Sequence, residues 1–447
     1  MGGKHSMWRA IAAVGALLLL GATACTAENE AEPPVTVGPS GSHEPVTLTY
    51  WGAWTGREYR EFDKIFDRFE ERYPWITVND VGGIDDQKLL SAINGGNQPD
   101  ASQSFSPDNT GKFCSSGAFI SLNDLIEQDG LDLDQFPPAA MKNTTFEGNT
   151  CGVPFTLDAY GLYYNKDLLA EAGFDGPPET ISELTEMAKK LTVFDPDGSI
   201  RVAGFVPWFG YYEHLPVNIG HAFGGQWYDD EGHSALASDP AWAEMLQWQR
   251  DLVDFYGAEE LAKFVAAQGN EFSHANDFQS GRVAMILDGE WRVAFIDDGA
   301  PDLTYGTAPF PVSDDHPELA GSGPIAGDII GIPRGSEHPA EAWLLLKFMA
   351  TDTETLVYMG NVIRNVPTTI AALQSPGLDA PPEFQTFLDI AQHPGSSFKQ
   401  LTLLGEGDQT IFLQWLEKWQ AGRVPDLEAG LQQVSQQIDD QVEQASV

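Results

Sequence analysis

The stretch VTLTYWGAWTGREYREFDKIFDRFEERYPWITV, residues 46–78, decides the fold class. Residues 46–50 alternate between apolar and polar and predict a strand, and residues 76–78 predict a second strand. Between them, Thr55 and Glu58 have the spacing of a capping box, and aromatic residues at intervals of three and four predict an amphipathic helix. A strand, a helix and a strand in this order are typical of a parallel sheet covered by helices. The chain is therefore expected to be an α/β protein.

The same kind of pattern recurs along the chain. Strands are predicted at residues 161–165, 283–287 and 329–333, and a surface helix is predicted at residues 427–442. Another helix is predicted after Thr180, which with Glu183 forms a second capping box. Its expected apolar face consists of Ile181, Leu184, Met187, Ala188 and Leu191. No segment repeats at the period of a solenoid, so two α/β lobes are the expected organisation.

Composition and charge limit the possible partners. Of the 447 residues, 42% are hydrophobic, which is enough for a sizeable core. The 66 acidic residues outnumber the 24 Lys and Arg and give a net charge of −42. A surface this acidic repels phosphate backbones and excludes a nucleic-acid partner. The same charge suits a secreted, soluble protein.

The N-terminus has the features of a targeting segment. A short basic region is followed by an apolar run that is too short to span a bilayer, so residues 1–24 are predicted to be a signal peptide. Small residues leading into Cys25 resemble a bacterial lipobox, which implies a lipid-anchored cysteine; ordinary cleavage after Ala24 is the alternative. Residues 25–45 are rich in Pro, Gly, Ser and Glu and are expected to be a flexible tether. The predicted location is outside the cytoplasm, anchored to the outer face of the cell membrane.

Two further cysteines, Cys114 and Cys151, would lie in an oxidising compartment. No His or third Cys stands near them at the spacing of metal ligands, so a structural disulfide is preferred and no metal site is expected.

Five further segments, read in order, carry a family resemblance: PDASQS (99–104), GLYYNKDLLAEAG (161–173), FQSGRVAMILDGEW (278–291), YGTAPFPV (305–312) and GDIIGIPRGSEHPAEAWLLLKFMA (327–350). Together with the opening stretch, their succession resembles the family 1 extracellular solute-binding proteins of ABC importers, the group that includes maltose-binding protein. The ligand-contacting loops match no single substrate subgroup.

The resemblance implies a two-lobed, periplasmic-binding-protein-like type II fold, in which each lobe is a mixed, mainly parallel sheet flanked by helices. By analogy, one lobe comprises residues 46–155 plus 307–365, and the other comprises residues 156–306 plus 366–447. It implies a monomer without a cofactor that closes on a carbohydrate, expected to be an oligosaccharide, and delivers it to the subunits of an ABC permease.

Aromatic residues are the first candidates for ligand contact. Sugars offer apolar faces that stack on aromatic rings and hydroxyl groups that hydrogen-bond to polar side chains. Trp51 and Trp54 follow the first predicted strand, where open α/β sheets bind ligands. A position in the core is the alternative for each of them. Tyr160 lies near the first predicted crossing between the lobes, and the resemblance places Trp291 under the sugar.

Three carboxylates are candidates for binding hydroxyl groups: Asp100, Glu290 and Asp328. The resemblance supports Asp100 and Asp328. Asp100 equally fits the cap of a turn, and Glu290 equally fits a solvated position.

Trp208 and Trp227 lie in loops bounded by Pro and Gly, and Arg364 lies near the last predicted crossing. The alternatives are a surface loop filled by its own aromatic residues for the two tryptophans, and a surface ion pair for Arg364.

Other functions remain as alternatives. A secreted glycoside hydrolase would need two carboxyl groups flanking the scissile bond, and the sequence pairs none at such a distance. It also has no Gly-x-Ser-x-Gly, His-Glu-x-x-His or phosphate-binding Gly loop with a Lys, so an enzyme is not expected. A binding protein for a polyamine, a metal chelate or glycerol phosphate is the nearer alternative.

Overall fold

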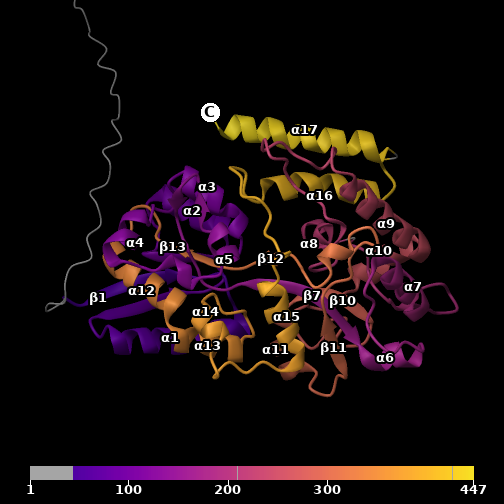
Figure 1. Ribbon diagram of the computed structural model, residues 1–447, viewed down its shortest axis with the longest axis horizontal. Coiled ribbons are helices and arrows are strands. Elements are labelled where there is room, and N and C mark those ends of the chain that lie inside the picture. The colour runs from indigo at the N-terminus through magenta and orange to yellow at the C-terminus, as the bar shows by residue number, and fades with distance from the viewer. Residues whose placement is uncertain (1–43, 209, 425, 447) are drawn as a thin grey trace, which may run out of the picture. The chain divides into compact units, whose positions relative to one another are not determined.

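The computed structural model describes residues 44–208, 210–424 and 426–446. The predicted signal peptide, the lipidation residue Cys25 and nearly all of the predicted tether lie outside the described residues. Within the described part, the chain has a two-lobed α/β fold with one five-stranded sheet and one four-stranded sheet, each accompanied by helices (Figure 1). No helix in this part is long and apolar enough to cross a membrane.

The first sheet has the order β2-β1-β3-β13-β6. Strand β1 pairs in parallel with β2 and β3, whereas β13 is antiparallel to both β3 and β6. The parallel β1–β2 pair confirms the fold class that the opening stretch predicts. The strands are β1 (Val46–Trp51), β2 (Ile76–Val81), β3 (Ala101–Ser104), β6 (Val153–Pro154) and β13 (Ile329–Gly331).

Helix α1 (Gly56–Arg72) connects β1 to β2, as the aromatic spacing predicts. Its buried face consists of Phe62, Ile65, Phe66 and Phe69. The predicted capping box is wrong, because Thr55 is the N-cap residue but its side chain makes no capping hydrogen bond. Glu58 lies instead near the charges of Arg57 and Asp158.

Shorter elements complete the region of the first sheet. They are α2 (Asp86–Gly95), η1 (Pro107–Asn109), α3 (Thr110–Ser115), α4 (Asn123–Asp129), η2 (Leu133–Gln135), α5 (Pro138–Lys142), β4 (Thr145–Phe146), β5 (Asn149–Thr150), α12 (Pro339–Thr351), α13 (Thr353–Val362) and α14 (Ile370–Leu373).

In the second sheet, β7 (Asp158–Asn165) lies between β10 (Met285–Gly289) and β11 (Tyr305–Ala308), and it also pairs with β12 (Ile325–Ala326). All three neighbours are antiparallel to β7. The expected predominance of parallel pairing is therefore wrong for the named strands of this sheet. β10 and β11, which helix α11 (Arg292–Gly299) connects, run in the same direction, but β7 separates them.

Helices cover the second sheet. Helix α7 (Ile181–Leu191) buries all five residues of its predicted apolar face, and the Thr180 side chain caps it by accepting a hydrogen bond from Glu183. Helix α17 (Leu427–Ala445) packs beside α16 (Gly407–Gln420) (Figure 1). The other elements are α6 (Lys166–Glu171), β8 (Val193–Phe194), β9 (Ile200–Val202), α8 (Pro216–Gly220), η3 (His221–Phe223), α9 (Pro240–Tyr256), α10 (Ala258–Ala266), η4 (Pro317–Leu319) and α15 (Pro382–Gln392).

Three chain segments pass between the two sheets and are hydrogen-bonded to one another. The Phe155 amide donates to the carbonyl of Asp328 at 2.9 Å, and Leu157 exchanges backbone hydrogen bonds with Val366. Because β11 and β12 both pair with β7, and β13 pairs with β3, the second of these crossings lies at about Gly327. The predicted boundary at residue 307 is therefore too early.

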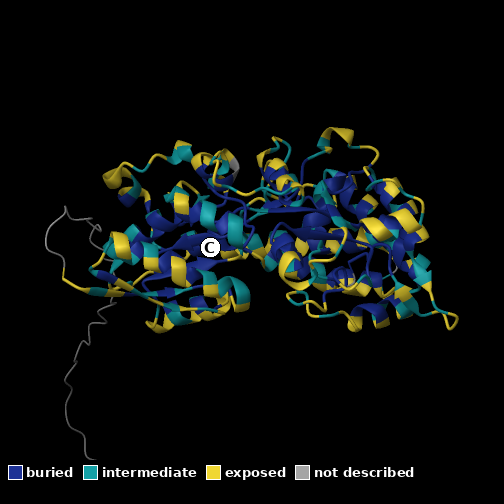
Figure 2. Cartoon of the chain, turned by 90° about the horizontal axis from the view of Figure 1, so that it is seen from below, coloured by how far each residue is buried: buried dark blue, intermediate teal, exposed yellow. Residues whose placement is uncertain are grey.

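Buried residues occupy the strands and the helix faces turned toward them (Figure 2). One core extends from the first sheet to one side of β7, and a second core joins the other side of β7 to α7, α9, α16 and α17.

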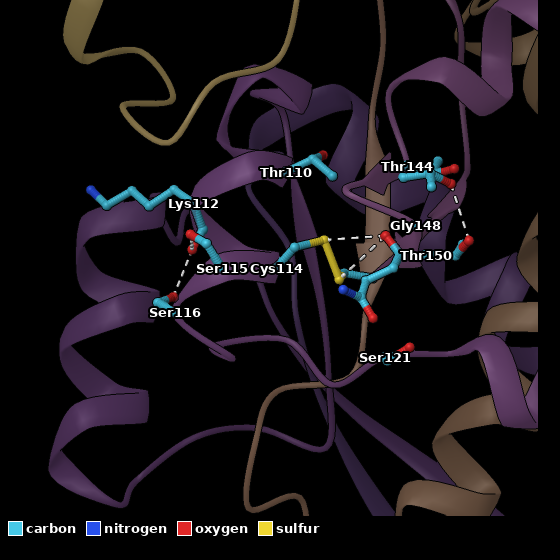
Figure 3. The surroundings of a disulfide bond; sticks show 12 residues. Thr110, Lys112, Cys114, Ser115, Ser116, Ser121, Thr144, Gly148 and Thr150 are labelled. Atoms are coloured by element: carbon cyan, nitrogen blue, oxygen red, sulfur yellow. Dashed lines mark hydrogen bonds between the residues drawn. A yellow bond between two sulfur atoms is a disulfide. The ribbon is translucent and has the colours of Figure 1, made fainter. Parts of the chain in front are cut away.

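The predicted disulfide is present between Cys114 in α3 and Cys151, which directly follows the short strand β5 (Figure 3). Their Cα atoms are 5.6 Å apart. The bond ties the end of α3 to the hairpin β4–β5, and Cys151 itself belongs to a small apolar cluster with Phe113 and Phe119.

Candidate functional site

The main cavity of the described residues has a volume of about 750 Å³, within the range of sites for small ligands. Its walls come from distant parts of the chain. Residues 105–108 follow β3 of the first sheet, and residues 142–145 connect α5 to β4. Residues 213–228 and 395–409 belong to segments packed with the second sheet. Such a cavity is suited to hold a ligand between two structural units.

Aromatic rings form part of the cavity wall. Trp227 lies edge-on to Trp242 and Phe412, with ring centres 5.0 and 5.7 Å away, so the core fixes its orientation. Phe105 is 41% exposed, although its ring is 5.8 Å from that of the buried Trp54. The other aromatic residues that line the cavity are Tyr160, Tyr228 and Phe398.

A buried lysine joins two walls of the cavity. Lys399 donates to both carboxylate oxygens of Asp408, at 2.6 and 2.8 Å, and lies 3.4 Å from Asp108 beyond β3. Burial alone would lower the pKa of Lys399, but Asp108 and Asp408 raise it above its ordinary value. Burial raises the pKa of Asp108 to about 6, against the effect of Lys399. The ion pairs therefore hold residues 105–109 against the segment that precedes α16.

Further contacts reinforce this junction. Gln409 donates to Asp108 at 2.5 Å, and the hydroxyl of Ser106 donates to Glu406. The amide of Glu406 donates to the side chain of Asn109 at 3.2 Å. These contacts connect one side of the cavity with the other.

The cavity also contains a histidine that is neutral at neutral pH. Burial lowers the pKa of His221 to about 4, with a further contribution from His393. Its Nε2 atom lies 2.9 Å from the hydroxyl of Ser322, and its Nδ1 atom lies 3.3 Å from that of Ser397. His221 therefore offers polar contacts without a charge.

Of the predicted ligand contacts, Tyr160 and Trp227 line the cavity. Trp291 does not line it, but its ring lies edge-on to Tyr160 with centres 5.6 Å apart. Within the described part of the chain, the buried indole nitrogen of Trp291 has no hydrogen-bond partner. Tyr160 and Trp291 therefore form a pair beside β7 and β10, and Trp227 belongs to the same core.

The other predicted tryptophans pack inside the protein. Trp54 lies edge-on to Phe62, with ring centres 4.8 Å apart, in the first core. Trp51 is half-buried against the cluster that contains Cys151, and Trp208 belongs to the second core.

Asp100 holds the start of β3 to its neighbours. Its carboxylate accepts from the amide and the hydroxyl of Thr49, at 2.8 and 2.9 Å, and from Ser336 and the amide of His338. Arg364 donates to the carbonyl and the carboxylate of Asp379, at 2.7 and 3.1 Å. Neither side chain lines the cavity.

Glu290 and Asp328 lie in a buried network at the crossings between the sheets. Asn365 donates to both Asp158 and Glu290, at 3.0 and 3.1 Å, while Asp328 accepts from Gln103 at 2.9 Å. Burial, and then the charge of Asp158, raises the pKa of Glu290 and of Asp328 well above the usual range. Through these hydrogen bonds, the two groups link the three crossing segments.

The sequence analysis missed most residues of the cavity wall, among them Phe105, Asp108, Glu213 and Lys399. Phe105 and Asp108 directly follow the segment PDASQS, so extending that motif would have included them. Nothing in the local sequence marks Glu213 or Lys399, because their place in the cavity depends on how distant segments pack.

Comparison with known proteins adds to this geometry. The model of the bacterial extracellular solute-binding protein family matches residues 53–355. A maltooligosaccharide ABC transporter solute-binding lipoprotein of Streptococcus pneumoniae is 26% identical over 78% of this chain and 77% of its own length. The maltotriose-binding protein of Pyrococcus abyssi is 24% identical over 74% of this chain and 69% of its own length.

Solved structures show the same similarity. The structure of CpMnBP1 with mannotriose bound has a TM-score of 0.79 and 27% identity, over 87% of this chain and 99% of that one. The substrate-binding protein Lmo0181 of Listeria monocytogenes, in complex with cycloalternan, has a TM-score of 0.76 and 20% identity, over 90% of this chain and 100% of that one. The second likeness concerns the fold alone.

Proposed function

The chain belongs to the bacterial extracellular solute-binding protein family, and on that premise we propose that it captures a carbohydrate, expected to be an oligosaccharide, and delivers it to the permease of an ABC importer. The observation that carries the proposal is the aromatic-walled cavity of about 750 Å³ between segments of the two lobes. Relatives whose names specify maltotriose or maltooligosaccharides support the choice of ligand class.

The cavity supplies both kinds of contact that a sugar requires. Phe105 and Trp227 offer apolar ring surface, and the hydroxyl groups of Tyr160 and Tyr228 can hydrogen-bond. We propose Phe105, Tyr160 and Trp227 as ligand contacts, with Trp291 behind Tyr160. The other predicted contacts stay predictions, and they have the internal positions described above: Trp51, Trp54, Asp100, Trp208, Glu290, Asp328 and Arg364.

Capture follows from contacts on both sides of the cavity. A ligand that touches residues 105–108 and residues 213–228 together binds the closed arrangement better than an open one, and it shifts the equilibrium by that difference. The permease would then recognise the closed form. Lipid anchoring through Cys25, release of a signal peptide and a monomeric state complete the proposal, and the function requires no catalytic step.

Ligand-dependent unfolding tests the proposal. The protein is heated with a panel of maltooligosaccharides, mannooligosaccharides, polyamines and glycerol phosphate. A ligand present at about 100 times its dissociation constant stabilises the native state by about 2.7 kcal/mol, which raises the melting temperature visibly. A rise with one class of oligosaccharide is the expected result. If only polyamines raise the melting temperature, the ligand is a cationic solute and not a carbohydrate.

Replacing Phe105 by alanine is expected to weaken binding of that sugar at least tenfold, about 1.4 kcal/mol, because the exposed ring is lost from the cavity wall. Phe272→Ala is the matched control, since Phe272 is 50% exposed and lies outside the cavity. Titration calorimetry gives both affinities. Equal affinities of the two variants for the sugar would show that Phe105 does not contact the ligand.

A further inference from the structure

Glu213 has an unusual backbone conformation at the cavity wall. It is one of three residues other than glycine with positive φ in the described chain, at 55°. This left-handed conformation is costly for a residue with a side chain and persists where the surroundings impose it. Glu213 also lines the main cavity.

The next residue in the chain imposes this conformation. His214 is completely buried, and its ring stacks on Phe205 with centres 4.4 Å apart. Its Nε2 atom accepts from the amide of Leu287 at 2.9 Å, so its Nδ1–H donates to the carbonyl of Val206 at 2.5 Å. Burial lowers the pKa of His214 to about 4, so the ring stays neutral and keeps both bonds. The chain behind Glu213 is therefore fixed to the core.

A second contact fixes the side chain. The Nδ2 group of Asn218, in α8, donates to the backbone carbonyl of Glu213 at 2.9 Å and to its Oε2 atom at 3.0 Å. One carboxylate oxygen is thus held against the backbone. The neighbouring Tyr212 also forms a side-chain hydrogen bond with the carboxyl group.

The charged groups around Glu213 are acidic. The charges of Asp288 in β10 and Asp158 in β7 both act on Glu213, and Asp288 is itself paired with Arg292 at 2.6 Å. Tyr160 of β7 and Tyr212 contribute phenol groups, whose pKa values burial raises well above their ordinary value. Among the described residues, no Lys, Arg or His forms an ion pair with Glu213.

The protonation state follows from these surroundings. Burial, and then the charge of Asp288, raises the pKa of Glu213 to about 8, although hydrogen bonds from Tyr212 and Asn218 oppose the rise. At neutral pH the group is a carboxylic acid with one O–H to donate.

We propose that Glu213 determines the specificity of the cavity, because its carboxyl group, fixed in the wall without a cationic partner, donates a hydrogen bond to an oxygen of an uncharged ligand. The inference rests on the proposed function and narrows it. Sugar hydroxyl and ring oxygens accept such a bond. A cationic ligand would instead favour the ionised carboxylate, so the same residue discriminates between the two ligand classes.

The pH dependence of binding tests the proposal, with maltotriose and mannotriose as probes in titration calorimetry. At pH 9 only about one tenth of Glu213 is protonated, so the apparent Kd of the wild-type protein is expected to be about tenfold higher than at pH 6. Glu213→Gln keeps a hydrogen-bond donor and is expected to bind with a Kd independent of pH in this range. Glu271→Gln is the control, because burial raises the pKa of Glu271 to about 7, but it lies outside the main cavity. This variant should keep the wild-type pH profile.

A second measurement needs no ligand. Raising the pH from 5 to 8 ionises Glu213 in the unfolded chain but not in the folded protein, so the wild type loses stability relative to Glu213→Gln over that range. The difference in melting temperature is expected to grow up to about pH 8 and then remain constant. If no sugar binds but the difference in melting temperature changes with pH in this way, the proposed function is wrong, whereas the protonation of Glu213 at neutral pH is confirmed.

Three results would overturn the proposal. A difference in melting temperature that does not change with pH means that Glu213 is ionised throughout. A wild-type Kd without pH dependence, or the same dependence in Glu213→Gln, means that the carboxyl group does not donate to the ligand. Tighter binding of a polyamine than of either sugar at pH 6, where Glu213 is protonated, would reverse the assigned specificity.

Discussion

Replacing Arg292 by methionine is expected to lower the free energy of unfolding by about 3–5 kcal/mol, because it leaves a buried carboxylate without its partner. Arg292 is 0% exposed and donates from Nε to Asp288, also fully buried, at 2.6 Å. It further donates to the carbonyl of Glu271 at 2.5 Å, so the substitution removes a backbone partner as well. Urea denaturation of the wild type and the variant measures the loss.

Two controls identify the cause. The double variant Asp288→Asn with Arg292→Met removes both charges and is expected to recover much of the loss. Lys263→Met breaks exposed pairs with Glu259 and Glu260, which solvent screens, so it should change the free energy of unfolding far less. A loss for Arg292→Met no greater than that for Lys263→Met would mean that the buried pair contributes no more than a surface pair.

Removing the disulfide by the double substitution Cys114→Ala and Cys151→Ala is expected to lower the free energy of unfolding by about 4 kcal/mol. The bond closes a loop of 37 residues in the unfolded chain, and its loss gives that chain more conformational freedom. The melting temperature without reductant should fall accordingly. Cys151 is buried beside Phe113 and Phe119, so alanine is preferred to serine, which would bury a hydroxyl group.

A reducing agent provides the comparison. It should lower the melting temperature of the wild-type protein toward that of the double variant and leave the double variant unchanged. If the reductant lowers the melting temperatures of the wild type and the double variant equally, its effect is not caused by reduction of this disulfide.

The fold was largely predictable because local patterns carry it. The alternation in residues 46–50 and the aromatic spacing of α1 are properties of neighbouring residues, and the structure confirms both elements. The direction of strand pairing was harder to predict from the sequence. Nothing near residues 158–165 indicates that β7 receives three antiparallel neighbours from segments more than a hundred residues later. The boundary at residue 307 was misplaced for the same reason, since it depends on the partner of β12.

The site was less predictable than the fold. Tyr160 and Trp227 line the cavity, but loop position alone did not separate such residues from Trp54, which packs in the core. The distinction depends on the neighbours that a ring finds in three dimensions. Glu213 could not be predicted from the sequence for a further reason, since the burial of His214 imposes its backbone conformation.

The position of β13 in the first sheet has a consequence for the order in which the protein folds. β13 lies between β3 and β6, and its neighbour Asp328 bonds to Gln103, 225 residues earlier in the chain. The chain is synthesised from its N-terminus, so the edge of β3 that pairs with β13 has no partner until residue 331 has been added. Contacts so distant in sequence slow folding, and an unpaired strand edge invites aggregation. The nascent chain is therefore expected to stay unfolded through most of its synthesis, and a chain in that state can still be threaded through a narrow export channel.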